Sequence, residues 1–154
     1  CYPAAHSAFL LNLGLETLSV RMKQYCENAL KVANHLKSHE KIDSIRYPAL
    51  EGDEYHERAK KYLPLGTSGV MSINIKGGRQ AAMKFMDSVK LACNEVHVAD
   101  IRTCVLHPAS ETHRQLTDEQ LVAAGVAPAL VRLSVGLENV DDIIADLDQA
   151  LAQI

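Results

Sequence analysis

Arg132 is the residue whose type and position in this chain best suit a chemical role. It lies in the segment 129–138, where Val131, Leu133 and Val135 alternate with one guanidinium and one hydroxyl group. A period of two predicts a β-strand with one buried face. A guanidinium fixed on the other face suits the binding of a carboxylate through two parallel hydrogen bonds. From the alternation alone, a solvated arginine on an antiparallel sheet is the more common arrangement.

Other polar groups in the sequence favour structural interpretations. The segment 107–113 holds two histidines and a serine, but their spacing matches neither a common metal site nor a nucleophile motif. A loop held by Pro108 and by local hydrogen bonds is the favoured interpretation. His35 and His39 lie four residues apart on a predicted helix, without a third metal ligand nearby. Lys76 precedes two glycines, where a turn lysine usually points to water rather than forming a Schiff base.

Hydrophobic periodicity predicts the elements that must position Arg132. Helices are expected at residues 7–38, 54–62, 79–89 and 117–125, and again after Asn139. Strands are expected at residues 42–47, 69–75 and 103–106, and around Arg132. The order predicts an α+β fold: a small, mainly antiparallel sheet covered by helices on one face and preceded by a long helix.

Length and composition limit the classes of protein and partner. A chain of 154 residues with 47% hydrophobic and 23% charged residues predicts one globular domain. Its net charge of -3 argues against nucleic acid as a partner. No apolar run is long enough to cross a membrane, so no membrane partner is expected.

The four cysteines stand at positions 1, 26, 93 and 104 without a C-x-x-C spacing. This pattern predicts reduced thiols and hence a cytoplasmic location. A catalytic pairing of Cys104 with His97 or His107 is less favoured. Because the sequence begins with cysteine rather than methionine, we expect its N-terminus to be a cut in a longer protein.

Six motifs extend over nearly the whole chain. They occupy residues 7–18, 26–29, 59–64, 76–79, 107–113 and 131–138. The last two, His-Pro-Ala-Ser-x-Thr-His and Val-Arg-Leu-Ser-Val-Gly-Leu-Glu, are highly specific in tandem. In these motifs the chain resembles the Cys/Met-metabolism family of pyridoxal-phosphate enzymes. The resemblance implies that residues 1–154 are the C-terminal domain of a fold-type I enzyme, with the cofactor-binding domain absent from the chain.

Within that family, the histidine-led motif resembles O-acetylhomoserine sulfhydrylases or methionine γ-lyases more than the cystathionine γ-synthases and γ-lyases. The segment 115–126 resembles the sulfhydrylases more than the methionine γ-lyases. These use pyridoxal phosphate to make homocysteine from O-acetylhomoserine and sulfide, usually as tetramers. A non-catalytic binding or assembly module descended from the same domain is an alternative of another class.

The resemblance implies a role for two residues. The arginine that binds the substrate α-carboxylate in the family corresponds to Arg132, and a serine that helps to hold it corresponds to Thr103. The Schiff-base lysine and the other cofactor ligands have no counterpart here, so no catalytic, cofactor or metal residue is expected. We therefore expect the chain alone to be inactive. We also expect it to self-associate through the face that would meet the cofactor domain.

Overall fold

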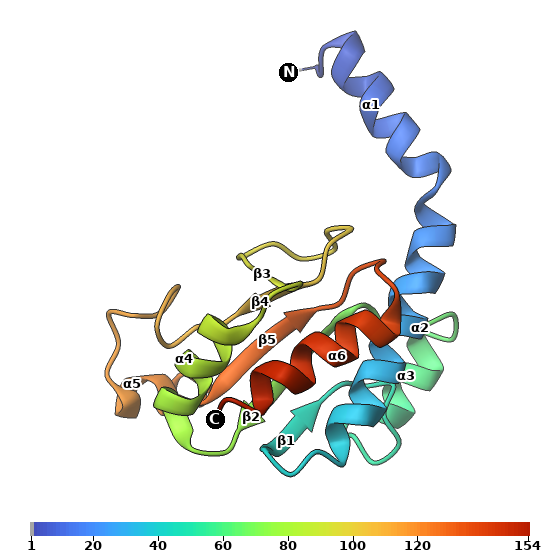
Figure 1. Cartoon of the computed structure of the whole chain (residues 1–154). Coiled ribbons are helices and arrows are strands. Elements are labelled where there is room, and N and C mark those ends of the chain that lie inside the picture. Colours follow the sequence, from blue (N-terminus) through green and yellow to red (C-terminus); the bar gives the residue numbers. More distant parts are fainter. Residues whose placement is uncertain (1) are drawn as a thin grey trace.

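The computed structural model describes residues 2–154, in which five strands form one sheet with helices on one of its faces (Figure 1). The strands are β1 (Ile42–Arg46), β2 (Val70–Ile75), β3 (Cys93–Asn94), β4 (Cys104–Leu106) and β5 (Leu130–Ser134). The helices are α1 (Ala5–Glu16), α2 (Leu18–Lys37), α3 (His56–Tyr62), α4 (Gly78–Ser88), α5 (Asp118–Ala123) and α6 (Val140–Leu151). The strand order is β1-β2-β5-β4-β3, antiparallel except for the β3–β4 pair. The predicted α+β fold is confirmed.

Alternation along β2 and β5 assigns one face of the sheet to the core, as a period of two requires. The buried residues of this face are Met71, Ile73, Ile75, Val131 and Leu133. Helices α2, α4 and α6 cover it, with α6 in contact with both of the others (Figure 1). Arg132 lies on the opposite face, together with its register partners Ser72 on β2 and the buried Leu106 on β4.

The long helix expected near the N-terminus is divided at Thr17, whose φ of -106° and ψ of 2° separate α1 from α2. Helix α1 extends away from the sheet, and none of its residues is buried (Figure 1). The side chains of α2 that are buried all follow its second turn: Tyr25, Asn28, Ala29, Val32, Ala33 and Leu36. The predicted apolar stripe thus packs on the sheet in its second half only. Among the helices of residues 2–154, none is both long and apolar enough to cross a membrane.

Two predicted helix caps are confirmed. The Thr117 hydroxyl accepts from the Gln120 amide at 3.3 Å, while Gln120 Oε1 accepts from the Thr117 amide at 2.9 Å. This capping box fixes the start of α5. The Asn139 side chain accepts from the Asp141 amide at 2.9 Å and caps α6. Both helices therefore begin where their side chains satisfy free backbone donors.

Asp146 on α6 fixes the chain before it enters β3. Its carboxylate accepts from the backbone amides of Lys90, Leu91 and Ala92 at 2.8, 3.0 and 2.9 Å. Hydrogen bonds to an ionised carboxylate are stronger than those between neutral groups. The helical layer thereby fixes the start of the segment that runs through β3 toward Arg132.

Candidate functional site

Arg132 is fixed on the polar face of β5 by the loop at residues 95–101. Its Nη2 donates to the carbonyl oxygens of Val96 and His97 at 2.8 and 3.1 Å. Its Nε is buried and has no hydrogen-bond partner within residues 2–154. A buried donor without an acceptor is costly, and most such groups in proteins are satisfied. The guanidinium is therefore held at Nη2, while Nη1, which has no hydrogen-bond partner within residues 2–154 and is not among the buried unpartnered atoms, is available to an incoming anion.

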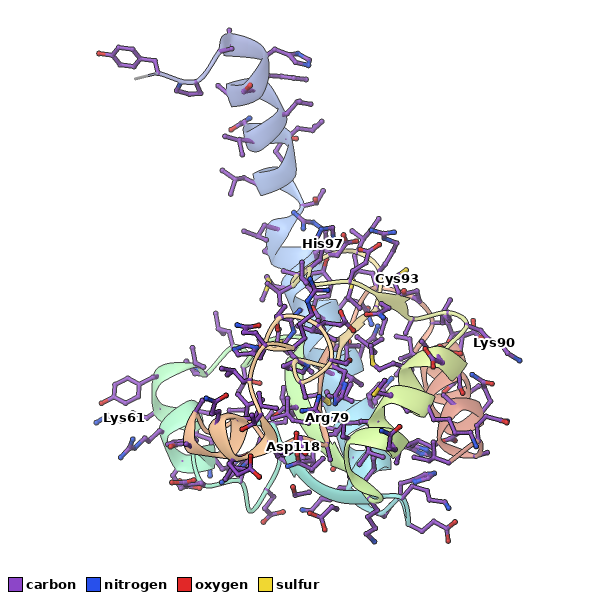
Figure 2. All side chains as sticks on the ribbon, turned by 90° about the vertical axis from the view of Figure 1, so that its left-hand side faces the viewer. Lys61, Arg79, Lys90, Cys93, His97 and Asp118 are labelled. Carbon is purple, nitrogen blue, oxygen red and sulfur yellow. The ribbon has the colours of Figure 1, made fainter. Side chains whose placement is uncertain are left out.

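The loop is itself fastened to the strand that carries Arg132. The Ala99 amide donates to Ser134 Oγ at 3.1 Å, and the Leu137 amide donates to the Ile101 carbonyl at 2.8 Å. Ala99 has a φ of 58°, in the left-handed region, which costs a non-glycine residue about 1 kcal/mol. Figure 2 shows Cys93 and His97 on the yellow segment that leads from α4 through this loop. The contacts hold the loop across β5 despite the backbone strain.

Thr103 lies beneath the site and is fully buried. Its backbone amide and its hydroxyl donate to the two carboxylate oxygens of Glu138 at 2.6 and 2.9 Å. The same hydroxyl accepts from the Gly136 amide at 3.0 Å. Its single proton is thus used by Glu138, and a contact of Thr103 with substrate stays a prediction. In this structure Thr103 positions the chain at the end of the 95–101 loop.

Gly136 allows this close arrangement. A Cβ atom at this position would lie 2.5 Å from both the Ile101 oxygen and the Arg102 carbonyl carbon. Asn28 of α2 adds a second support, since its Nδ2 donates to the carbonyls of Gly136 and Glu138 at 3.0 and 3.1 Å. Sequence reasoning did not predict Asn28 or Glu138 as part of the site. For Glu138, the Gly-Leu-Glu sequence that follows the strand was the available signal.

Charged side chains cluster on the same loop. His97 Nδ1 lies 3.0 Å from Glu95 Oε2 and 3.4 Å from Asp100 Oδ2. Arg102 pairs with both carboxylates, at 3.1 Å from Glu95 and 3.3 Å from Asp100. Through these hydrogen bonds Arg102 lowers the pKa of Asp100 to about 2. The His97 and carboxylate atoms are close enough together to hold a metal ion, but Arg102 already supplies the compensating positive charge.

The segment around His107 is a structural element. His107 is buried, and its Nε2 lies 2.8 Å from the Pro128 carbonyl oxygen, which can only accept. We therefore assign the proton to Nε2, so that Nδ1 accepts from the Ser110 hydroxyl at 2.8 Å. Arg79 and Asp118 point toward one another beside this segment (Figure 2) and form a salt bridge. The predicted loop held by local hydrogen bonds is confirmed.

The remaining candidates of the sequence are also bound by structural partners. His35 Nε2 and His39 Nε2 lie 2.7 and 3.9 Å from Asp148 Oδ1, which joins α2 to α6. Lys76 Nζ donates to the Glu40 carbonyl at 2.8 Å. Lys76 follows the end of β2 that pairs with the start of β5, and its ammonium is bound away from the 95–101 loop. Neither group contributes to the site around Arg132.

Comparison with known proteins gives one family. Residues 1–152 match the family described as Cys/Met metabolism PLP-dependent enzyme. The chain is 47% identical over 143 residues to the homocysteine synthase of Schizosaccharomyces pombe, covering 93% of this chain and 33% of that protein. It is 45% identical over 149 residues to the O-acetyl-L-homoserine sulfhydrylase of Leptospira meyeri, covering 96% of this chain and 34% of that protein. It is 44% identical over 147 residues to an L-methionine gamma-lyase of Fusobacterium nucleatum subsp. polymorphum, covering 96% of this chain and 37% of that protein.

A solved structure gives the same result. A putative O-acetylhomoserine (thiol)-lyase of Campylobacter jejuni, whose crystal holds N'-pyridoxyl-lysine-5'-monophosphate, superposes with a TM-score of 0.87 at 44% identity. The match covers 94% of this chain and 34% of that one. The chain therefore spans about a third of the length of the relatives it matches.

Proposed function

Because the chain belongs to the Cys/Met-metabolism family of PLP-dependent enzymes, we propose that residues 1–154 are the C-terminal domain of such an enzyme and bind the α-carboxylate of its amino-acid substrate through Arg132. One observation carries the proposal: two loop carbonyls hold Nη2 of the guanidinium, while neither Nη1 nor the buried Nε has an acceptor within residues 2–154. A carboxylate oxygen is the acceptor that such a donor binds most strongly.

The grip on Arg132 explains how the site orients a substrate. The Val96 and His97 carbonyls hold Nη2, so the guanidinium plane cannot turn freely about its long side chain. A clamp fixed in this way positions the amino acid before reaction and lowers the entropic cost of the chemical step. Thr103 supports the clamp indirectly through Glu138. A direct bond from its hydroxyl to the substrate requires that the Glu138 contact be exchanged.

The cofactor of the family is held elsewhere in our proposal. Pyridoxal phosphate supplies the electron sink for chemistry at the amino acid when it is bound. Lys76, the candidate Schiff-base lysine before a glycine turn, does not fit this role, since its ammonium is bound to a backbone carbonyl away from Arg132. The Schiff-base lysine would lie in a cofactor domain that partners this one, in a homotetrameric enzyme. Residues 1–154 alone are then inactive.

Two reactions compete for the whole enzyme. Sulfhydrylation of O-acetylhomoserine to homocysteine is the first, supported by relatives named homocysteine synthase and O-acetylhomoserine sulfhydrylase at 45–47% identity. Cleavage of methionine is the second, supported by a methionine gamma-lyase at 44% identity. Turnover of O-acetylhomoserine with sulfide against turnover of methionine alone, both with the full-length protein, separates them. We expect the first substrate pair to give the larger kcat/KM.

The role of Arg132 is tested in the full-length enzyme with Arg132→Ala and Arg132→Lys. Loss of a charge-assisted hydrogen bond is expected to raise the KM for the amino acid about 10- to 100-fold. The absorbance of bound cofactor should be unchanged. Arg58→Ala is the control, because Arg58 is exposed on α3, where its guanidinium lies over the Tyr55 ring. An Arg132→Ala enzyme with an unchanged KM would contradict the assignment.

A further inference from the structure

Cys93 and Cys104 are register partners on the parallel strands β3 and β4. Both are free thiols. Neighbouring strands lie about 4.7–4.9 Å apart, which falls within the Cα separations of about 4.4–6.8 Å that disulfides span. Register partners also point their side chains to the same face of a sheet. We propose that Cys93 and Cys104 form a reversible disulfide, a redox-sensitive site beside Arg132.

The two thiols differ in a way that assigns their roles. Cys93 is half-buried on an edge strand, and Arg102 Nη1 lies 3.9 Å from its sulfur. A small disulfide in solvent reaches such a partly exposed thiol more readily than a buried one. Cys104 is buried, and its burial together with nearby Asp100 raises its pKa. Cys93 is therefore the attacking thiol and Cys104 the one that completes the disulfide.

The oxidant in this proposal is a low-molecular-weight disulfide such as oxidised glutathione. The Cys93 thiolate attacks one sulfur of that disulfide, forms a mixed disulfide and releases one small thiolate. Cys104 then loses its proton to solvent and attacks the Cys93 sulfur, which expels the second small thiol. In total, two protein thiols are oxidised and one small disulfide is reduced to two thiols. An excess of reduced thiol reverses both steps.

The position of the pair gives the disulfide a structural consequence. It would close a ring of residues 93–104 that contains the 95–101 loop, and this loop provides both carbonyls that hold Arg132. On the far side of the sheet from the helices, Cys104 is the register partner of Ser134, which anchors the loop through Ala99. Oxidation would thus act on the segment that positions the guanidinium. The inference does not rest on the proposed enzyme activity.

Peptide mapping tests the proposal directly. The chain is equilibrated with mixtures of oxidised and reduced glutathione, its free thiols are blocked with N-ethylmaleimide to stop exchange, and it is digested with trypsin without reduction. Cleavage after Lys90, Arg102 and Arg114 places the two cysteines in separate peptides, residues 91–102 and 103–114. We expect a disulfide-linked pair of these peptides as the main oxidised product, from protein that migrates as a single chain under denaturing, non-reducing conditions. Dithiothreitol should abolish it.

Cysteine substitutions show which two residues form the disulfide. Cys93→Ser, at a half-buried position, should eliminate the linked pair, and Cys104→Ala should do the same without burying a new hydroxyl group. Cys26→Ser is the matched control and should leave the pair intact, since Cys26 lies on α2. The proposal is overturned if the linked pair is absent from the unmodified chain, if Cys93 carries only a mixed disulfide, or if the linkage is found only between two chains.

Discussion

The Glu138 carboxylate accepts two hydrogen bonds from Thr103, one from its amide at 2.6 Å and one from its hydroxyl at 2.9 Å. This pair joins the end of the 95–101 loop to the segment that follows β5. Because Arg132 lies on β5 and is held by carbonyls of that loop, the pair fixes the two sides of the site relative to one another. A partly buried two-point contact of this kind positions the guanidinium without touching it.

Thr103→Val tests this contact, because valine keeps the side-chain shape but removes the hydroxyl group. The Gly136 amide and one Glu138 oxygen then lose a partner, so we expect the free energy of unfolding to fall by about 1–3 kcal/mol. Thr103→Ser retains the hydroxyl and should lose less. Urea denaturation of the two variants measures the difference. Equal stability of the serine and valine variants would show that the hydroxyl has no positioning role.

Gly136→Ala should destabilise the same junction by another route. The added methyl group would meet the backbone of Ile101 and Arg102 at 2.5 Å, so the loop must move. Overpacking of this kind costs about 1–3 kcal/mol. Gly14→Ala is the matched control, because nothing lies within 4 Å of its added methyl group in α1. Because alanine favours a helix over glycine by up to about 1 kcal/mol, the control should not lower the unfolding free energy. A similar loss in both variants would contradict the packing argument.

Local pattern was sufficient to predict the strand that carries Arg132. Alternation in residues 131–135 specified its conformation and its buried face, and the caps at Thr117 and Asn139 specified where two helices begin. These features depend on neighbours in sequence, which is why periodicity and side-chain type reveal them. The same pattern left a solvated arginine and a fixed one as alternatives.

The tertiary contacts could not be obtained in this way. Strand β3 has only two residues, too few to show any period, and the Asp146 carboxylate that binds the Ala92 amide just before it comes from the distant helix α6. The carbonyls that hold Arg132 lie about 36 residues upstream of it. The sequence also could not tell whether the apolar side chains of α1 are buried. An apolar stripe on a helix looks the same whether or not another element packs against it.

The Asp100–Arg102 contact predicts a response to acid. The pKa of Asp100 falls from 3.8 to about 2 because Arg102 donates to its carboxylate. A lowered pKa means that the contact stabilises the folded loop fully above pH 3.8 and is lost as the pH falls through about 2. Carbon-detected NMR titration of the Asp100 carboxylate measures this. Arg102→Gln should return the pKa toward 3.8, whereas Arg114→Gln should leave it unchanged.

Helix α1 predicts how residues 1–154 behave in isolation. Phe9, Leu11 and Leu15 have exposed fractions of 60%, 67% and 63%, on the helix α1, which contributes no buried residue. Large exposed apolar surfaces drive association, so we expect light scattering to show oligomers. The double variant Phe9→Glu/Leu11→Glu should shift the chain to monomer without lowering its unfolding free energy, since neither side chain is in the core. Gln153→Glu adds charge elsewhere and should leave the oligomers intact. A monomeric unmodified chain would contradict the prediction.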